Sequence, residues 1–367
     1  MNSVYSLRRE KLLEQLAENG PGKAMVTSPL NICYLTGNRI AQYERLYALV
    51  LDGANKSYSF LLPSLHNSLP LEGSIEKVSY NDEDDPATLL GEIIGSSDCL
   101  GVEFDAFPFT LSNKLTSLNS ALHYQDLGTL LSKHRMLKTG EEIEALQTAA
   151  TYSDQVYAII AAEVKPGISE KAILAKIFSL IAELDGTQND PYVIQVLNGS
   201  NTANPHGDAG DRLLQKGEPL SVDFGVCYAH YWSDCTRTFF AGKPDPQFET
   251  IYNVVLEAQE AAISKIKPGV RIREIDFAAR QVIEKAGYGE CFIHRTGHGI
   301  GLNIHEEPKI HCRNDDPLLE GMTFTVEPGI YIPGLGGVRI EDDVLVIAEG
   351  SRVFSRYPKT FNDMILT

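Results

Sequence analysis

One histidine and four carboxylates in the second half of the chain have the types and order expected of metal ligands. The five residues are Asp223, Asp234, His298, Glu327 and Glu341. Each carboxylate pair lies in a segment that reads as two strands around a turn, so both of its members can reach the same point. Four acids around one neutral imidazole would repel one another unless cations lay between them. The pattern therefore predicts a coordination shell for two metal ions, of the kind found in two-metal hydrolytic sites.

Two of these acids are surrounded by apolar neighbours in the sequence. Asp223 and Glu327 each lie inside an otherwise apolar strand, where an unpaired charge costs several kcal/mol. The alternative for any one of the four acids is a solvated group on a sheet surface, which is the usual place for Asp and Glu. Bound metal ions would explain all four positions together. Arg339, two residues before Glu341 and so on the same strand face, is expected to orient a metal-binding carboxylate, with a plain ion pair as the alternative.

The elements that must position these residues divide into two parts. Up to about residue 130, apolar runs alternate with turn signals near residues 23–29, 46–51 and 58–63, and helical stretches are expected near 6–18 and 86–95. A basic stretch, residues 132–138, is expected to be irregular. Thr139 and Glu142 then have the spacing of a capping box before a long helix over residues 143–164. We predict an α/β domain over residues 1–132 and a catalytic domain over residues 133–367.

The second part contains a faint internal repeat. Lys-Pro-Gly turns at residues 165–167 and 267–269 each separate one predicted helix from the next. A β-rich segment with acidic residues follows each pair of helices, over residues 219–242 and 322–347. These features predict a duplicated helix-helix-sheet unit with the site where the two halves meet.

Composition excludes several classes of protein. The chain has 367 residues, 43% of them hydrophobic, and a net charge of −17, which disfavours nucleic acid or an anionic membrane as a partner. No stretch reaches the ~18 uninterrupted apolar residues of a membrane span, and the amino terminus has no signal-like apolar region. Six cysteines without a CxxC pair are expected to be reduced thiols. A cytoplasmic protein is the expectation.

Several sequence blocks, in the same order, resemble the creatinase/prolidase/methionine aminopeptidase superfamily, the pita-bread metallopeptidases. The blocks are residues 222–225 (Val-Asp-Phe-Gly), 233–239 (Ser-Asp-Cys-Thr-Arg-Thr-Phe), 294–301 (His-Arg-Thr-Gly-His-Gly-Ile-Gly), 305–308 (His-Glu-Glu-Pro), 326–331 (Val-Glu-Pro-Gly-Ile-Tyr) and 339–343 (Arg-Ile-Glu-Asp-Asp). Residues 28–37 are similar, more weakly, to the opening of a creatinase-like domain. The resemblance is strongest to Xaa-Pro dipeptidase (prolidase) and short Xaa-Pro aminopeptidases. It implies an α/β fold: a creatinase-like amino-terminal domain followed by a pita-bread catalytic domain with a pseudo-twofold repeat.

The resemblance also assigns roles to the five ligand-type residues. Asp223 should bind one metal ion, Asp234 and Glu341 should bridge both ions, and His298 and Glu327 should complete the second. A metal-bridging hydroxide is the expected nucleophile, with Glu327 as the general base that passes a proton to the leaving nitrogen. Mn²⁺ is the first choice of metal, and Co²⁺, Zn²⁺ or Fe²⁺ would also suit these ligands.

Further residues match positions that bind substrate in the superfamily. His206, in a loop rich in Asn, Pro and Gly, and His305, seven residues after His298, would hold the substrate carbonyl and stabilise the tetrahedral intermediate. Lys309 lies where similar dipeptidases carry a basic residue and would pair with the carboxylate at the end of a dipeptide. A solvated lysine is the alternative. His294, His230 and His311 are expected to be structural.

Alternatives remain on the same fold. The chain could be an Xaa-Pro aminopeptidase acting on longer peptides, a metal-free hydrolase like creatinase, a methionine aminopeptidase, or a scaffold that binds without catalysis. The complete ligand set argues against a metal-free hydrolase and a scaffold, and the domain before the long helix argues against a methionine aminopeptidase. Lys309 favours an Xaa-Pro dipeptidase over an aminopeptidase. The resemblance further implies a homodimer in which residues 39–45 help to close the partner's site.

Overall fold

The computed structural model describes residues 3–41, 43–188 and 193–366 and divides into two compact units, Met1–Arg135 and Met136–Thr367. Each unit has its own buried apolar cluster. Among the described residues, no helix combines the length and apolar character that a membrane crossing requires.

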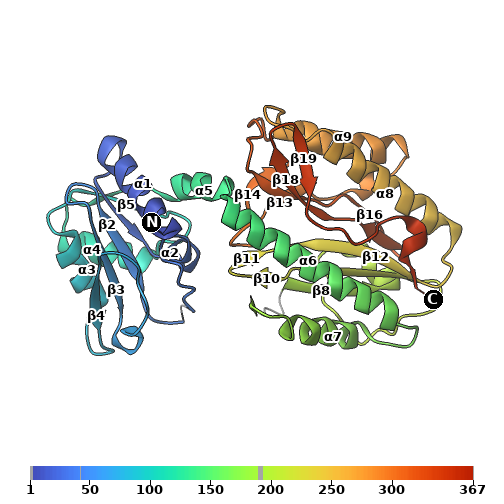
Figure 1. The fold of residues 1–367 in the computed structure, drawn as a ribbon, viewed down its shortest axis with the longest axis horizontal. Helices are drawn as coiled ribbons and strands as arrows, with labels where there is room; N and C mark the ends of the chain where they lie inside the picture. The colour runs from blue at the N-terminus through green and yellow to red at the C-terminus, as the bar shows by residue number, and fades with distance from the viewer. Residues whose placement is uncertain (1–2, 42, 189–192, 367) are drawn as a thin grey trace. The chain divides into compact units, whose positions relative to one another are not determined.

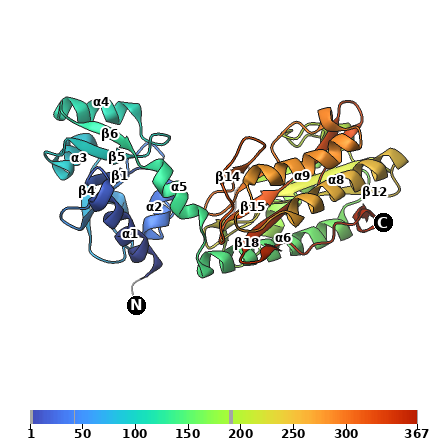
Figure 2. The same ribbon diagram turned by 90° about the horizontal axis from the view of Figure 1, so that it is seen from above.

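The first unit is a six-stranded mixed sheet with helices on both faces. Its strands are β1 (Lys23–Val26), β2 (Ala48–Asp52), β3 (Ser57–Pro63), β4 (Ile75–Tyr80), β5 (Cys99–Val102) and β6 (His123–Asp126), in the order β4-β3-β2-β1-β5-β6. Its helices are α1 (Val4–Asn19), α2 (Pro29–Thr36), α3 (Pro86–Ile94), α4 (Phe109–Leu118) and α5 (Gly128–Met136), with a 3-10 turn at Ser64–His66. Figures 1 and 2 show α1 and α2 on one side of this sheet and α3 and α4 on the other. The predicted α/β domain is confirmed.

Most of the basic stretch over residues 132–138 is helical rather than irregular. Residues 132–136, expected to be irregular, form the last turns of α5. The expectation was wrong because charge does not oppose helix formation and no Gly or Pro interrupts residues 129–136. Leu131 is fully buried on one face of this helix, and Lys133 and Arg135 lie in its last turn, where the helix dipole favours cations.

The second unit repeats one arrangement of two helices and a set of strands. Its helices are α6 (Gly140–Glu163), α7 (Glu170–Ala182), α8 (Pro246–Ser264) and α9 (Ile272–Lys285), with 3-10 turns at Gly199–Ala203, Gly289–Cys291 and Phe361–Met364. Thr139 and Glu142 form the predicted capping box of α6. Figure 1 shows α8 and α9 along one edge of this unit and α7 along the opposite edge, with the strands between them.

The two Pro-Gly turns confirm the internal repeat at the level of single hydrogen bonds. Gly167 N donates to Leu214 O at 2.8 Å, and Gly269 N donates to Leu318 O at the same distance. Because each turn ties the start of the following helix to a later segment, both helix pairs are fixed to their strands in the same way.

The strands of each half form two nested antiparallel pairs. In the first half the strands are β7 (Thr187–Gln188), β8 (Ile194–Asn198), β9 (Pro219–Phe224), β10 (Cys227–Tyr228), β11 (Tyr231–Trp232) and β12 (Cys235–Ala241). In the second half they are β13 (Gly297–Gly299), β14 (Glu306–Ile310), β15 (Thr323–Val326), β16 (Gly329–Ile332), β17 (Gly336–Arg339), β18 (Asp342–Ile347), β19 (Gly350–Val353) and β20 (Ile365–Leu366), the last of which pairs with β12. β9 pairs with β12 around the β10–β11 ribbon, and β15 pairs with β18 around the β16–β17 ribbon.

Candidate metal centre

The five predicted ligands line one cavity of about 700 Å³ in the second unit. Its lining consists of Val193, Gln195, Pro205, His206, Asp223, Asp234, His294, Arg295, His298, Ile304, His305, Glu327, Arg339 and Glu341. Both halves of the repeat contribute, so the cavity lies where the halves meet, as the sequence predicted.

The four carboxylates occupy equivalent places in the nested strand pairs. Asp223 is near the end of β9 and Asp234 directly precedes β12, while Glu327 directly follows β15 and Glu341 directly precedes β18. Each carboxylate therefore lies at the junction between an outer strand pair (β9–β12 or β15–β18) and the ribbon that it encloses (β10–β11 or β16–β17). Asp223 is opposite Thr236 in the β9–β12 pairing, so the two aspartates are offset along the ladder rather than directly opposed. This offset lets both carboxylates point to one place without the repulsion of a directly facing pair.

The ligand atoms form overlapping sets. Ligand atoms of Asp223, Asp234 and Glu341 lie within 4.8 Å of one another, and so do those of His298, Glu327 and Glu341. His298 Nε2 is 3.5 Å from Asp234 Oδ2 and 3.5 Å from Glu327 Oε1. Glu341 belongs to both sets, as a carboxylate shared by two cations would.

Burial and mutual repulsion make this cluster costly when no cation is bound. Burial raises the pKa of Asp234 well above its ordinary value, and the neighbouring Glu341 and Asp223 raise it further. Burial likewise raises the pKa of Glu341 well above its ordinary value, and it raises the pKa of Glu327 to about 7 against the opposing charge of Arg339. Divalent cations would remove this repulsion, and carboxylate oxygens with one imidazole suit Mn²⁺, Co²⁺, Zn²⁺ or Fe²⁺. The donor set therefore fits bound metal.

His298 has the tautomer that a metal ligand needs. Its Nδ1 lies 3.2 Å from Gly299 O, and a carbonyl oxygen can only accept, so Nδ1 carries the proton and Nε2 presents its lone pair to the carboxylates. Burial lowers the pKa of His298 to about 3, so the ring is neutral near pH 7.

Two glycines allow β13, the strand that carries His298, to lie close to the backbones of β14 and β15. A Cβ at Gly297 would lie 1.9 Å from Thr325 O, and a Cβ at Gly299 would lie 2.1 Å from Glu307 O. β13 pairs with β14 on one side and with β15 on the other. The close approach of these backbones explains why glycine flanks the histidine on both sides.

Arg339 holds two of the carboxylates through its guanidinium. Nη2 donates to Asp223 Oδ2 at 2.5 Å, and Nε donates to Thr236 Oγ1, which in turn donates to Glu341 Oε2 at 2.6 Å. Nη1 donates to the hydroxyl of Tyr331. Thr236 and Tyr331 were absent from the predicted site, because only the fold brings the strands that carry them beside Arg339.

His294 also lines the cavity, although the sequence suggested only a structural histidine. Its Nδ1 donates to Arg295 O at 2.7 Å, so its Nε2 accepts from the Tyr331 hydroxyl at 2.8 Å. Burial lowers the pKa of His294 to about 4, which keeps the ring neutral. Its position four residues before His298 in the same glycine-rich run was the available signal.

His206 precedes all five predicted ligands in the sequence and His305 lies between His298 and Glu327, and both histidines line the same cavity. The loop that carries His206 is held by Gln195, whose Nε2 donates to Pro205 O and Gly207 O. The ring centroids of His305 and His298 are 4.1 Å apart and nearly perpendicular. Both predicted substrate-binding histidines can therefore reach a molecule bound beside the ligands.

The two candidate cations for a substrate carboxylate have different surroundings. Lys309 is opposite His298 in the β13–β14 pairing, but its side chain is 55% exposed, lies 3.1 Å from Glu307 Oε1 and is outside the cavity lining. Arg295 is half-buried and lines the cavity. The segment around Arg295 is fixed by α9, where buried Asp276 accepts from Thr296 Oγ1 at 2.7 Å. Sequence reasoning included Arg295 in a motif without giving it a role.

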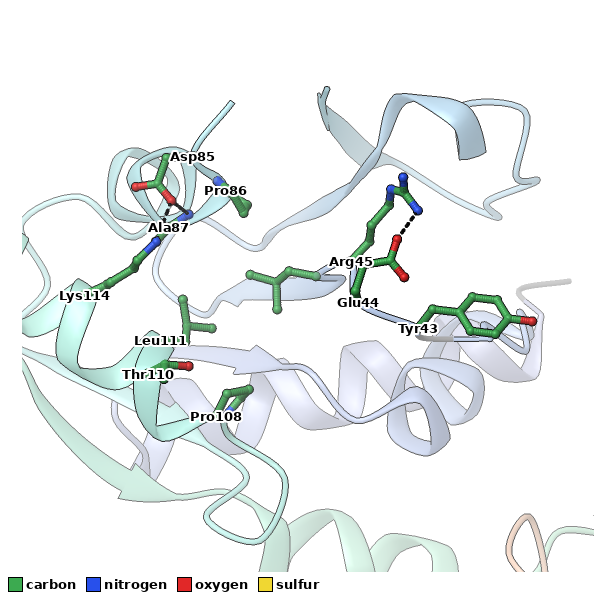
Figure 3. Close-up of a pocket in the computed structure, with 11 residues that line it drawn as sticks. Tyr43, Glu44, Arg45, Asp85, Pro86, Ala87, Pro108, Thr110, Leu111 and Lys114 are labelled. Atoms are coloured by element: carbon green, nitrogen blue, oxygen red, sulfur yellow. Dashed lines mark hydrogen bonds and ion pairs between the residues drawn. The ribbon is translucent and has the colours of Figure 1, made fainter. Parts of the chain in front are cut away.

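A second hollow, of about 500 Å³, lies in the first unit (Figure 3). Its ionic groups neutralise one another: Lys114 lies 3.2 Å from Asp85, and Arg45 contacts Glu44 and Asp82. Among the described residues, the groups suited to a metal ion all come from the second unit. The cavity in the second unit is therefore the stronger candidate for an active site.

Comparison with known proteins places the chain in a family. Residues 144–348 match metallopeptidase family M24, and residues 8–137 match the creatinase/prolidase N-terminal domain. The chain belongs to metallopeptidase family M24. This M24 peptidase is 37% identical over 353 residues to an uncharacterized peptidase of Staphylococcus aureus, a match that covers 95% of this chain and 99% of the relative.

Solved structures of similar proteins agree with this family. A recombinant prolidase from Thermococcus sibiricus has a TM-score of 0.92 and 32% identity, with 100% of both chains covered. An X-Pro aminopeptidase from Thermotoga maritima has a TM-score of 0.87 and 27% identity, covering 98% of this chain and 99% of that one. The predicted superfamily, two-domain fold and metallopeptidase class are confirmed.

Proposed function

We propose that this M24 peptidase hydrolyses Xaa-Pro bonds with two divalent metal ions, and that Xaa-Pro dipeptides are its main substrates. The observation that carries the proposal is the pair of ligand sets that share Glu341 inside one cavity. Divalent metal ions bound there would activate a water molecule as nucleophile and polarise the scissile carbonyl. Mn²⁺ is our first candidate.

The residues of the chain have distinct roles in this proposal. Asp223, Asp234, His298, Glu327 and Glu341 hold the metal ions. Glu327 also acts as general base, as the resemblance implies: its ionised carboxylate, beside the metal-bound water, can take up a proton and pass it to the leaving nitrogen. His206 and His305 hold the substrate carbonyl, and Arg339 keeps the Asp223 carboxylate oriented.

Two arguments support proline as the residue after the cut. An Xaa-Pro bond is a tertiary amide without an N–H, so a site that grips an extended backbone through that N–H cannot use it. A site built on metal ions and histidines does not need that grip. The similar solved structures described above are a prolidase and an X-Pro aminopeptidase.

The preference for dipeptides depends on a cation that binds the substrate's terminal carboxylate. Lys309 is the residue that the resemblance suggests, but Glu307 already pairs with it outside the cavity lining. Arg295 lines the cavity and can form two parallel bonds to a carboxylate. We therefore put Arg295 beside Lys309 as the second candidate. An aminopeptidase acting on longer peptides would need neither.

Hydrolysis of Ala-Pro and Ala-Pro-Ala by the manganese-loaded protein, with metal content measured on the same sample, tests the proposal. We expect two Mn²⁺ ions per chain and a kcat/KM for Ala-Pro at least tenfold above that for Ala-Pro-Ala. A preference for Ala-Pro-Ala would instead indicate the aminopeptidase. Metal binding without cleavage of either peptide would indicate a non-catalytic scaffold.

Two variants identify the carboxylate anchor in the same assay. If Arg295 is the anchor, Arg295→Met raises the KM for Ala-Pro while Lys309→Met leaves it unchanged, and the reverse holds if Lys309 is the anchor. Ala-Pro amide, which lacks the terminal charge, is the control substrate, and neither variant should change its KM. A homodimer and a cytoplasmic location are part of the proposal and rest on the resemblance and the composition.

A further inference from the structure

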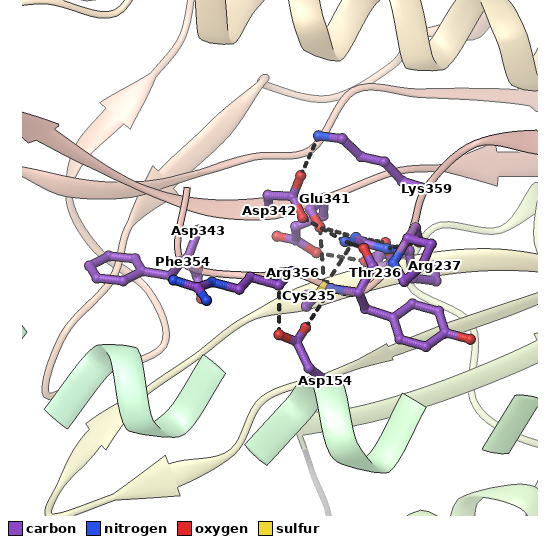
Figure 4. Close-up of polar contacts among 12 residues, drawn as sticks. Asp154, Cys235, Thr236, Arg237, Glu341, Asp342, Asp343, Phe354, Arg356 and Lys359 are labelled. Carbon is purple, nitrogen blue, oxygen red and sulfur yellow. Dashed lines mark hydrogen bonds and ion pairs between the residues drawn. The ribbon is translucent and has the colours of Figure 1, made fainter. Parts of the chain in front are cut away.

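A buried group of polar side chains lies directly behind the ligand-bearing strands. We name it the Asp342 cluster; it consists of Arg237, Gln259, Asp342 and Lys359. Asp342 Oδ1 accepts from Arg237 Nη2 at 2.7 Å, and Asp342 Oδ2 accepts from Lys359 Nζ at 2.6 Å and from Gln259 Nε2 at 3.0 Å. Figure 4 shows Arg237 and Lys359 both reaching Asp342. The four residues come from β12, α8, β18 and the segment before the last 3-10 turn.

The cluster contacts the backbone beside three of the five ligands. Arg237 Nη1 donates to the carbonyl of the ligand Glu341 at 2.6 Å and to Thr236 O, two residues after Asp234. Gln259 Nε2 lies 3.3 Å from Val326 O, the carbonyl directly before Glu327. One connected set of hydrogen bonds thus joins the strands that carry Asp234, Glu327 and Glu341.

Such a cluster is expensive to bury. Arg237 is 1% exposed, Asp342 is 1% exposed and Gln259 is fully buried. Burial alone would raise the pKa of Asp342, but the charges of Arg237 and Lys359 outweigh burial and keep that pKa below its ordinary value. Buried ion pairs often contribute no more stability than apolar residues of the same volume, so stability does not explain the cluster well. Fixing a geometry is a role that apolar residues could not fill.

We propose that the Asp342 cluster is a positioning device that keeps the ligand-bearing strands at the separation that metal binding requires. The inference rests on the proposed function for the presence of metal ions but not for the substrate. The net charge of the cluster has the opposite effect on metal affinity. Arg237 and Lys359 carry two positive charges against the one negative charge of Asp342, and this excess positive charge near the site would weaken metal binding. Geometry and charge therefore predict opposite effects when Lys359 is removed.

Titration calorimetry of the metal-stripped full chain with Mn²⁺ separates these effects. We expect Gln259→Met, which changes no charge, and Lys359→Met each to raise the Kd for Mn²⁺ about tenfold, a typical effect of losing a residue that orients metal ligands. Lys359→Arg, which keeps a donor and the charge, should bring the Kd back to within about threefold of the wild type. At saturating Mn²⁺ the KM for Ala-Pro should not change, because the cluster does not line the cavity.

Lys171→Met is the matched control, since it removes an exposed ion pair with Asp211 in the same unit. An unchanged Kd in both test variants, with only a lower melting temperature, would show a structural role and overturn the proposal. So would tighter Mn²⁺ binding by Lys359→Met, which would show that charge dominates. Because Lys359 is 24% exposed, its variants should fold, and they test the positioning role if Gln259→Met fails to fold. A wild-type chain that binds Mn²⁺ but leaves Ala-Pro intact would contradict the proposed substrate. The Mn²⁺ affinities of the variants would still test the role of the Asp342 cluster, because they do not depend on the substrate.

Discussion

At the scale of single residues, the site is a set of groups whose protonation is coupled to metal binding. Burial raises the pKa of Glu327 to about 7 in the metal-free chain, while His298, with a pKa of about 3, is already neutral. A cation binds the ionised carboxylate, so a proton held by Glu327 must leave when metal binds. Metal binding should therefore release protons below pH 7, and the histidine should contribute none of them.

This coupling predicts how Mn²⁺ affinity depends on pH. One group of pKa 7 that must lose its proton weakens binding about tenfold between pH 8 and pH 6. Asp234 and Glu341, whose pKa values are also raised, would steepen the dependence. Calorimetry at pH 6.5 in two buffers with different ionisation enthalpies should show at least one proton released per chain. Glu307→Gln, at the exposed Lys309 pair, should release as many; no release by the wild type would contradict the prediction.

At the scale of secondary-structure elements, sequence patterns predicted most of what is local. The capping box of α6, the turn between Asp223 and Asp234, which the structure has at Ala229, and the two Pro-Gly turns follow from residue types over a few positions. The helical end of α5 was missed because a run of basic residues suggested a loop, whereas a single buried leucine and the absence of Gly and Pro favour a helix. Local residue patterns predict helices and turns, but charge alone predicts them poorly.

Contacts between distant elements were not predictable in the same way. Arg339 was expected to orient a metal-binding carboxylate, but the sequence did not say which one: it bonds directly to Asp223, 116 residues away, and reaches Glu341 through Thr236. Gln259 gave no signal at all, because a glutamine on a helix is usually solvated. Its contact with Val326 O exists only because α8 packs behind β15. Residue spacing cannot reveal such contacts.

The element that carries His298 gives a prediction of its own. Gly297→Ala would place a methyl group 1.9 Å from Thr325 O, so β13 must separate from β15 and carry His298 away from the carboxylates. We expect a destabilisation of at least about 1–3 kcal/mol, as for overpacked cores, and a lower affinity for Mn²⁺. Thermal melting and calorimetry measure the two effects. Gly140→Ala, where no atom lies within 4 Å of the new Cβ, is the control and should leave the Mn²⁺ affinity unchanged without lowering stability; wild-type Mn²⁺ affinity in Gly297→Ala would contradict the argument.

At the scale of the whole molecule, each unit has its own core, and all the described groups suited to metal binding belong to the second. The Asp342 cluster and the Arg339 contacts join the two halves of that unit around the cavity. The metal ions would therefore stabilise the second unit directly, because they bind its folded state and not the unfolded chain.

Removing the metal should accordingly change the two units unequally. At a free Mn²⁺ concentration 100 times the Kd, each bound ion stabilises the native state by about 2.7 kcal/mol, which for a unit of this size corresponds to about 5–10 °C in melting temperature per ion. Calorimetric melting of the full chain with Mn²⁺ and with a chelator measures the shift. Hydrogen exchange on the same two samples assigns it: amides of β9, β12, β15 and β18 should lose protection when the metal is removed, while those of the six-stranded sheet of the first unit should not. Equal loss of protection in the strands of the two units would show that metal binding stabilises the chain as one cooperative body and would contradict the prediction.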